Sequence, residues 1–347
     1  MTGAPPVFDG HNDVLTTDDY GLIADGRPGG HLDLPRMRAG GVRGGIFSVF
    51  TRSAGGSRDH QVPRDDGVIE FEPAPPVEHA VAAADASAVA GRLLALERAG
   101  QVRLARSTSD LDRARDDETG PPVAVLHIEG AEAIDPGLEA LELWYGAGLR
   151  SVGPVWSRSN AFAHGVPFIS PSSPDTGPGL TDAGHALVRR CAELGILVDV
   201  SHLNEAGFWD LARMELGPIV ASHSAAHALC PASRNLTDAQ LDAIRDSDGL
   251  VGIVFACPFL RRDFADDPDT PIELIAQHAR YVADRIGVEH VALGSDYDGA
   301  TIPAPLGDVA GTPKLLDSLR AAGFGEEDLS AIGWDNWRRA LAAWWSA

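Results

Sequence analysis

Short apolar runs alternate with helical patterns along most of this 347-residue chain. The apolar runs have the length of buried strands, and the stretches between them repeat their apolar residues with the period of a helix. This alternation predicts parallel strands joined by crossover helices, because parallel neighbours need a long connection. The predicted strands begin near Val7, Gly44, Val123, Leu149, Ile196, Pro218, Leu250 and His290.

The predicted helices lie between these strands, and several begin at a Thr, Asp or Asn that can cap a helix. Eight strand–helix alternations predict an α/β fold, a (β/α)8 TIM-type barrel, whose active site lies at the C-terminal ends of the strands. The main helices are predicted at 77–99, 137–147, 181–194, 205–215, 238–246 and 272–286.

We expect one barrel domain over residues 1–347, because no linker divides the chain and its 44% hydrophobic content can fill a large core. Loop insertions are predicted near 51–76 and 157–179, which are rich in Gly, Pro and polar residues, and a C-terminal helix is predicted at 326–346. Long loops on a barrel commonly form lids or walls of the binding site.

The formal net charge of −22 argues against a nucleic-acid partner, because it repels phosphate backbones and no basic patch interrupts it. Small molecules are therefore the expected substrates. The N-terminal residues lack the basic and apolar regions of a secretion signal, and no window of the sequence predicts a membrane-spanning run. We expect a cytoplasmic protein with no membrane partner.

Histidine and acidic residues stand where the predicted strands end. His11 and Asp13 follow the first apolar run, and they project the same way because residues two apart in a strand share a face. Since the C-terminal ends of all barrel strands meet at one face, we expect these side chains to form one site. The other strand-end residues of this kind are Glu129, His202, His223 and Asp296.

Such a set can hold two metal ions for hydrolysis, provided that one side chain bridges them. The first pair can bind one ion, and His202 and His223 can bind the other. In barrel hydrolases the bridge is a carboxylate or a carboxylated lysine. The only lysine, Lys314, follows the last predicted strand, so Glu129 is the predicted bridge.

A further carboxylate can take a proton from the bridging water and pass it to the leaving group. Asp296, the last residue of the eighth strand, is best placed for this transfer, and Asp298 is the alternative. Proton transfer by a positioned side chain typically contributes about 10² to 10⁴ in rate.

Six motifs follow one another along the chain. They are Asp-Gly-His-Asn-Asp at 9–13, Ile-Glu-Gly at 128–130, Asp-Val-Ser-His at 199–202, Ser-His-Ser at 222–224, Ala-Ser-Arg-Asn at 232–235 and Gly-Ser-Asp-Tyr-Asp-Gly at 294–299. Together, from about Phe8 to Gly299, they resemble the membrane dipeptidase (renal dipeptidase) metallopeptidases, peptidase family M19. The resemblance implies a zinc-dependent dipeptidase with two Zn²⁺ per chain, which attacks the peptide bond with a metal-bridging hydroxide.

The resemblance also implies a role for each site residue. Arg234 would hold the terminal carboxylate of the substrate, a task that suits a planar guanidinium fork, and would limit substrates to dipeptides. A D-residue at the second position (L-Xaa-D-Xaa) and a homodimer are further implications. The resemblance assigns His11 and Asp13 to the first zinc, Glu129 to the bridge, His202 and His223 to the second zinc, and the acid/base role to Asp296.

Two departures from the family pattern affect the substrate pocket. Trp156 stands where the family has a histidine that steadies the tetrahedral intermediate, and an indole cannot become a cation. Trp156 is either a packing residue or a wall of the pocket, and His164 in the adjoining loop is the candidate substitute for the histidine. A family tyrosine near the end of the seventh strand is also missing from 254–257.

These departures leave two alternatives open. One is a related barrel metallohydrolase that acts on a lactone, a cyclic amide or an N-acyl amino acid, since it would share the metal centre and differ in the pocket. The other is a metal-binding homologue with impaired catalysis, which the tryptophan replacement favours.

Overall fold

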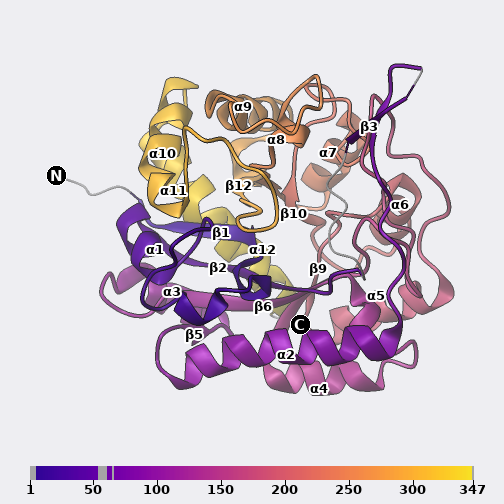
Figure 1. Cartoon of the computed structure of the whole chain (residues 1–347), viewed down its shortest axis with the longest axis horizontal. Helices are drawn as coiled ribbons and strands as arrows, with labels where there is room; N and C mark the ends of the chain where they lie inside the picture. Colours follow the sequence, from indigo (N-terminus) through magenta and orange to yellow (C-terminus); the bar gives the residue numbers. More distant parts are fainter. Residues whose placement is uncertain (1–4, 54–60, 65, 346–347) are drawn as a thin grey trace.

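The computed structural model describes residues 5–53, 61–64 and 66–345. Eight parallel strands surround the core, and helices cover their outer side (Figure 1). Each strand begins within two residues of its predicted start, the largest differences being 42 against 44 and 220 against 218. The strands are β1 (Val7–Asn12), β2 (Val42–Phe50), β6 (Val123–Glu129), β7 (Leu149–Gly153), β9 (Leu197–Val198), β10 (Val220–Ser224), β11 (Leu250–Ile253) and β12 (Val291–Leu293).

The strands form two parallel ladders that close into a barrel. One ladder runs β1–β2–β6–β7–β9 and the other β10–β11–β12. Single parallel bridges join them, Asp199–Val220 at one junction and Asn12–Tyr297 at the other. We call these junctions the β9/β10 seam and the β12/β1 seam. The structural relatives described below are barrels of the same type, so the predicted fold is confirmed.

The predicted crossover helices are present, with ends shifted by a few residues at most. Thr181, Asn204 and Thr237 cap three of them, each accepting a hydrogen bond from a backbone N–H in the first turn. Among the described residues, four further α-helices were not predicted: α1 (Leu34–Gly40), α3 (Thr108–Asp116), α8 (Cys257–Leu260) and α10 (Thr312–Ala321). The predicted set is α2 (His79–Arg98), α4 (Glu139–Ala147), α5 (Asp182–Leu194), α6 (Glu205–Ala212), α7 (Asp238–Asp246) and α9 (Glu273–Ile286).

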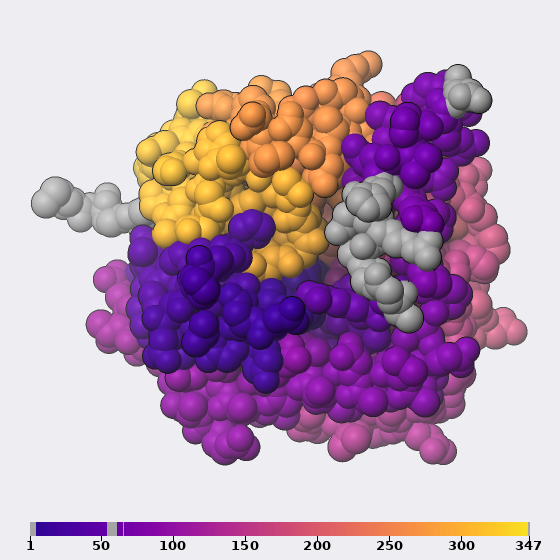
Figure 2. All heavy atoms as spheres, viewed as in Figure 1, coloured from indigo at the N-terminus to yellow at the C-terminus, as the bar shows by residue number. Residues whose placement is uncertain are grey.

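The C-terminal segment is helical from α11 (Glu326–Ser330) through a π-helical stretch, Ala331–Asp335, to α12 (Asn336–Trp345), and residue 346 lies outside the described residues. Its aromatic side chains pack against the barrel. The ring of Trp337 lies 5.8 Å from that of Phe8, and its indole N–H donates to the backbone of β12. Figure 2 shows the first and last parts of the chain, indigo and yellow, side by side.

The two predicted loop insertions pair with each other. β3 (Gln61–Pro63) and β4 (Ile69–Phe71) belong to the first, and β8 (Ile169–Ser170) belongs to the second. These strands form a small antiparallel sheet in the order β3–β4–β8. Residues 54–60 and 65 of the first insertion lie outside the described residues. The paired insertions add to one end of the barrel a layer that the sequence alone did not predict.

Helix α2 corrects one expectation, namely that no segment has the length and composition of a membrane span. Within the described residues, α2 alone is long and apolar enough to pass such a test. One such helix is only a weak indication of a membrane span, because a packed helix of a globular protein can have the same length and composition. Side chains including Ala82, Ala86, Val89 and Leu93 are buried on one face of α2.

Candidate metal centre

Five of the predicted site residues meet at the C-terminal ends of the barrel strands. Their side chains come from four places on the barrel rim and are almost fully buried, with residue exposures between 0% and 6%. Such burial of ionisable groups is costly unless they pair or bind a cation. The residues are His11 in β1, Asp13 just after it, Glu129 at the end of β6, His202 after β9 and His223 in β10.

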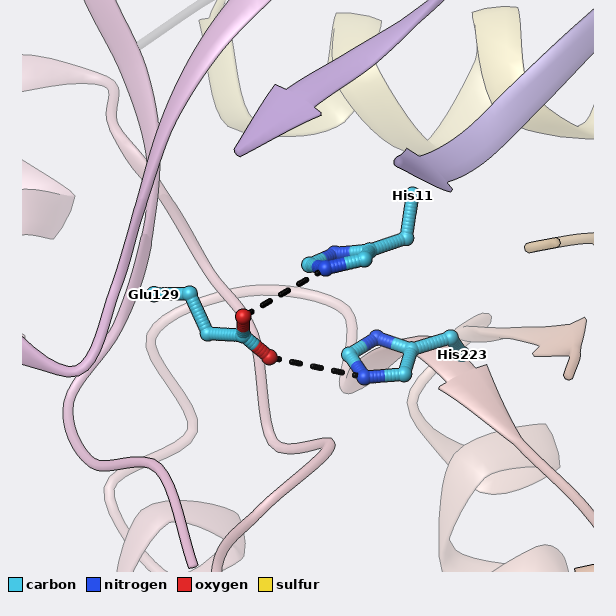
Figure 3. Close-up of side chains that lie close together, drawn as sticks. All are labelled: His11, Glu129 and His223. Atoms are coloured by element: carbon cyan, nitrogen blue, oxygen red, sulfur yellow. Dashed lines mark ion pairs between the residues drawn. The ribbon is translucent and has the colours of Figure 1, made fainter. Parts of the chain in front are cut away.

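Glu129 lies between the histidines, and its two carboxylate oxygens face different partners (Figure 3). Oε2 is 3.5 Å from Nε2 of His11. Oε1 is 2.9 Å from Nε2 of His202 and 3.5 Å from Nε2 of His223. A carboxylate that presents one oxygen to each of two ligand sets has the geometry required of a bridge between two cations.

Serine hydroxyls orient the two histidines on the Oε1 side. Ser157 Oγ lies 2.9 Å from Nδ1 of His202, and Ser222 Oγ lies 2.8 Å from Nδ1 of His223. The two Nε2 atoms are 3.0 Å apart and face Glu129. A second partner on one ring nitrogen, with the other nitrogen turned to a shared point, is the usual arrangement of metal-binding histidines.

A carboxylate pair lies on the Oε2 side. Oδ2 of Asp13 is 3.5 Å from Nε2 of His11, and one ligand atom from each of His11, Asp13 and Asp296 falls within 4.8 Å of the others. Gly299 permits this approach, since a Cβ there would lie 2.3 Å from Oδ2 of Asp13 and 2.4 Å from Oδ1 of Asp296. Only glycine leaves both carboxylates in place.

The residues present fit bound metal. Both ring nitrogens of His11 and Oδ1 of Asp13 are buried without a hydrogen-bond partner among the described residues. Unpaired polar atoms in a protein interior are rare and call for an explanation such as an ion. Imidazole nitrogens combined with carboxylate oxygens form a ligand set that suits zinc and similar divalent metals.

Burial and neighbouring charges give the carboxylates of Asp296 and Glu129 different pKa values. Burial raises the pKa of the Asp296 carboxyl to about 7, and the nearby Asp13 and Glu129 carboxylates act in the same direction. Burial also opposes ionisation of Glu129, but His11 and His202 hold its pKa well below the usual range. Glu129 is therefore suited to bind cations as an anion, whereas Asp296 is suited to exchange a proton near neutral pH.

Two buried aspartates, whose roles sequence reasoning missed, hold the ligand-bearing turns at the seams. Asp199 accepts hydrogen bonds from the backbone N–H groups of Ser201 and Ser222, and it bonds to both hydroxyls. Asp9 accepts from the N–H and hydroxyl of Ser295 at 2.8 and 2.9 Å. The available signal was a serine directly before each of three functional residues, His202, His223 and Asp296.

His127 points into the barrel beneath the site, as its two-residue spacing from Glu129 predicts. Its Nδ1 lies 2.9 Å from Ser151 Oγ, and its ring is 5.6 Å from that of His11. Burial lowers the pKa of His127 to about 4, so the ring is neutral and packs beside the ligands.

Arg234 carries a buried positive charge, and no carboxylate among the described residues forms an ion pair with it. Its Nη1 donates to Ser224 Oγ and its Nη2 to the carbonyl of His223, both at 2.7 Å. Nε is buried and has no partner within the described residues. Burial lowers the pKa of Arg234 to about 10, which still leaves it cationic at neutral pH. A buried guanidinium with an unused donor beside a candidate metal centre is suited to bind an anion.

The structure brings Trp156 to the site but places His164 and Asp298 elsewhere. The Trp156 ring lies 5.8 Å from that of His202. Nδ1 of His164 lies 3.3 Å from Ser159 Oγ, and within the described residues no hydrogen bond, ion pair or ring contact joins its side chain to the ligands. Asp298 binds Arg27 at 2.7 Å and accepts from a backbone N–H at 2.8 Å. These bonds give Asp298 a structural role in tying down the loop after β1.

Comparison with known families identifies the family of the chain. The model of the membrane dipeptidase family, peptidase family M19, matches residues 2–344. The chain belongs to this family. It is a metallo-dipeptidase, as the resemblance implied.

Individual relatives support the same assignment. The dipeptidase is 50% identical over 247 residues to an uncharacterised protein from the pqqA 5′ region of Klebsiella pneumoniae, a match covering 71% of this chain and 90% of the relative. A metallopeptidase from Rhodobacter sphaeroides, liganded with a phosphinate mimic of L-Ala-D-Ala, superposes with a TM-score of 0.92 and 43% identity, covering 98% of this chain and 99% of that one. The M19 dipeptidase AC gives 0.91 and 43%, covering 99% and 100%.

Proposed function

We propose that this metallo-dipeptidase binds two zinc ions and hydrolyses the peptide bond of dipeptides, including L-Xaa-D-Xaa. One observation carries the proposal: the Glu129 carboxylate presents one oxygen to His11 and the other to His202 and His223. Zinc at such a site supplies a bound water that ionises near neutral pH and a Lewis acid that polarises the carbonyl. His11 and Asp13 would hold one ion, and the two other histidines the second.

Asp296 is proposed to carry the proton. Its carboxyl, with a pKa of about 7, can accept a proton from the attacking water and return it to the departing amine. The left-handed backbone at Asp296, with φ of 62°, directs this side chain toward Asp13 and His11. Chemically, the role requires a group that changes protonation state at the working pH, and Glu129 with its lowered pKa does not meet that condition.

Arg234 is proposed to select substrates with a free C-terminal carboxylate one residue beyond the scissile bond. The unused Nε donor and the absence of a described ion-pair partner support this role. A carboxylate entering beside Arg234 would pair a charge that is otherwise buried alone, which is a strongly favourable contact. The L-Ala-D-Ala mimic bound to the Rhodobacter sphaeroides relative supports a D-residue at that position.

Metal analysis combined with a substrate panel tests the proposal. Purified wild-type protein is expected to contain two zinc ions per chain, and Glu129→Ala is expected to lose bound metal together with activity. L-Ala-D-Ala should be hydrolysed, whereas N-acetyl-alanine, which lacks a free amine, should not. Turnover of N-acetyl-alanine alone would instead favour the related metallohydrolase alternative, and a metal-loaded protein without turnover would favour the impaired homologue.

We also propose a homodimer, on the family resemblance alone. Light scattering on the purified full chain measures the molecular mass directly. A mass of about 36.5 kDa, that of one chain, would contradict the proposal.

A further inference from the structure

A row of aromatic side chains borders the candidate metal centre. We call Phe50, Trp156, Phe168 and Phe259 the aromatic wall. Phe168 lies at its middle, with its ring 5.6 Å from that of Trp156 and 5.1 Å from that of Phe259. Phe50 extends the row, 5.1 Å from Trp156. Phe50 ends β2, Trp156 directly precedes the 157–179 insertion, Phe168 lies within it, and Phe259 belongs to α8 (Cys257–Leu260).

The wall reaches both parts of the site that would contact a dipeptide. The rings of Trp156 and Phe168 lie 5.8 and 6.0 Å from that of His202, which faces Glu129. At the other end, the guanidinium carbon of Arg234 is 5.9 Å from the Phe259 ring. The wall therefore runs from the group proposed to hold the substrate carboxylate to a histidine of the metal centre.

Contacts behind the wall fix its shape. Arg158 is buried and donates to Glu132 Oε1 at 2.9 Å, and its guanidinium carbon lies 5.4 and 5.5 Å from the rings of Phe50 and Trp156. The N–H of Phe71 donates to the carbonyl of Phe168 at 2.9 Å, and this bond ties the two insertions together. Because the rings are held from behind, the wall is a pre-organised surface, which lowers the entropy cost of binding.

We propose that the aromatic wall selects the side chain of the dipeptide's C-terminal residue and favours apolar side chains there. The inference rests on the proposed function, in which Arg234 holds the carboxylate of that residue. The α-carbon attached to this carboxylate then lies between Arg234 and the metal ligands, beside Phe259 and Phe168. The N-terminal residue extends beyond the scissile bond, away from Arg234.

The chemistry of the wall sets the preference. An aliphatic side chain gains contact with two or three rings when it leaves water. An acidic side chain at the same place would lose its solvation beside aromatic rings, since Arg234 is occupied by the main-chain carboxylate and Arg158 is paired with Glu132. The wall thus discriminates by side-chain polarity and size.

Four dipeptides and two wall variants test the inference. For the wild type, we expect kcat/KM for L-Ala-D-Leu to be about tenfold higher than kcat/KM for either L-Ala-D-Ala or L-Ala-D-Asp. Phe168→Ala should reduce the D-Leu to D-Ala ratio by about tenfold, chiefly through KM, and should leave the ratio of L-Leu-D-Ala to L-Ala-D-Ala unchanged. Trp209→Ala, which removes an aromatic ring on α6 outside the wall, is the matched control and should keep the wild-type ratios.

Ratios measured within one preparation do not depend on the fraction of active protein. Trp156→Leu serves as a second wall variant if Phe168→Ala does not fold, and the same loss of discrimination is expected from it. Unchanged D-Leu to D-Ala ratios in a wall variant, or a change confined to the N-terminal residue, would overturn the inference while leaving the dipeptidase function intact. A wild-type protein that hydrolyses none of the four substrates would overturn the proposed function, and the inference with it.

Discussion

Replacing Gly299 by alanine perturbs the metal centre through a single methyl group. A Cβ at this position would lie 2.3 Å from Oδ2 of Asp13 and 2.4 Å from Oδ1 of Asp296, whereas ordinary contacts begin at 3.4 Å. Both carboxylates must therefore retreat by about 1 Å, the difference between 3.4 Å and 2.3–2.4 Å. The backbone of Gly299 lies outside the left-handed region, so alanine strains it little.

We expect Gly299→Ala to lower activity more than stability. Both colliding atoms are at the ends of side chains, which can rotate at about 0.5–1.5 kcal/mol each, so the free energy of unfolding should fall by about 1–3 kcal/mol. A misplacement of about 1 Å in a catalytic or ligand group can lower the rate by about 10². We therefore expect kcat/KM for L-Ala-D-Ala to fall about 100-fold in Gly299→Ala.

Steady-state kinetics with saturating zinc and thermal melts measure the effects on activity and on stability separately, and zinc titration shows whether metal binding changes as well. Gly91→Ala is the matched control, because it adds the same methyl group inside α2 with nothing within 4 Å of it. That variant should gain about 0.5–1 kcal/mol of stability and keep wild-type kinetics. Wild-type kcat/KM in Gly299→Ala would refute the placement of Asp13 and Asp296 around this glycine.

Three further outcomes are expected. Arg234→Met should lower kcat/KM about 100-fold through a higher KM. Arg234→Lys should recover part of this loss, because lysine restores the charge without the planar fork. Wild-type kinetics in both variants would exclude Arg234 as the anchor of the substrate carboxylate. Asp199→Asn should lower the free energy of unfolding by about 2–3 kcal/mol in urea titrations, since buried serine donors lose a charged acceptor, and unchanged stability would contradict this. Chelation should abolish activity and lower the melting temperature by several degrees, with zinc restoring both; full activity in metal-free protein would end the metal proposal.

The barrel was predictable because each of its main strands is a short apolar run that the local sequence shows. The run Val123–Glu129 is apolar except for His127 and Glu129 and is buried on both faces, as expected for a strand of a parallel sheet covered by helices. The sheet β3–β4–β8 could not be predicted, because no local sequence pattern marks its strands. Its strands are two or three residues long, and β4 pairs with β8 across about 100 residues of sequence, so neither periodicity nor turn chemistry marks them.

Within the site, position along the strands predicted the candidate ligands, but it gave only a weak ranking of similar side chains. Asp296 and Asp298 are both aspartates with positive φ in one short segment, and the sequence favoured Asp296 only by its place at the predicted end of the eighth strand. The difference comes from Arg27, which lies 271 residues away and binds Asp298 at 2.7 Å. Such a long-range contact is invisible in the local pattern, and it leaves Asp296 as the carboxylate turned toward Asp13.

Four of the candidate site residues, three predicted metal ligands and the proposed acid/base Asp296, lie at the two places where the barrel ladder is weakest. The β9/β10 seam has His202 on one side and His223 on the other, and the β12/β1 seam has Asp296 on one side and His11 on the other. At each seam an aspartate–serine contact takes over from the regular strand ladder. A backbone released from the regular ladder can turn its side chains inward at angles that a straight strand does not allow. An ion bound by both His202 and His223 would then close the β9/β10 seam, so that catalysis and barrel closure depend on the same bonds.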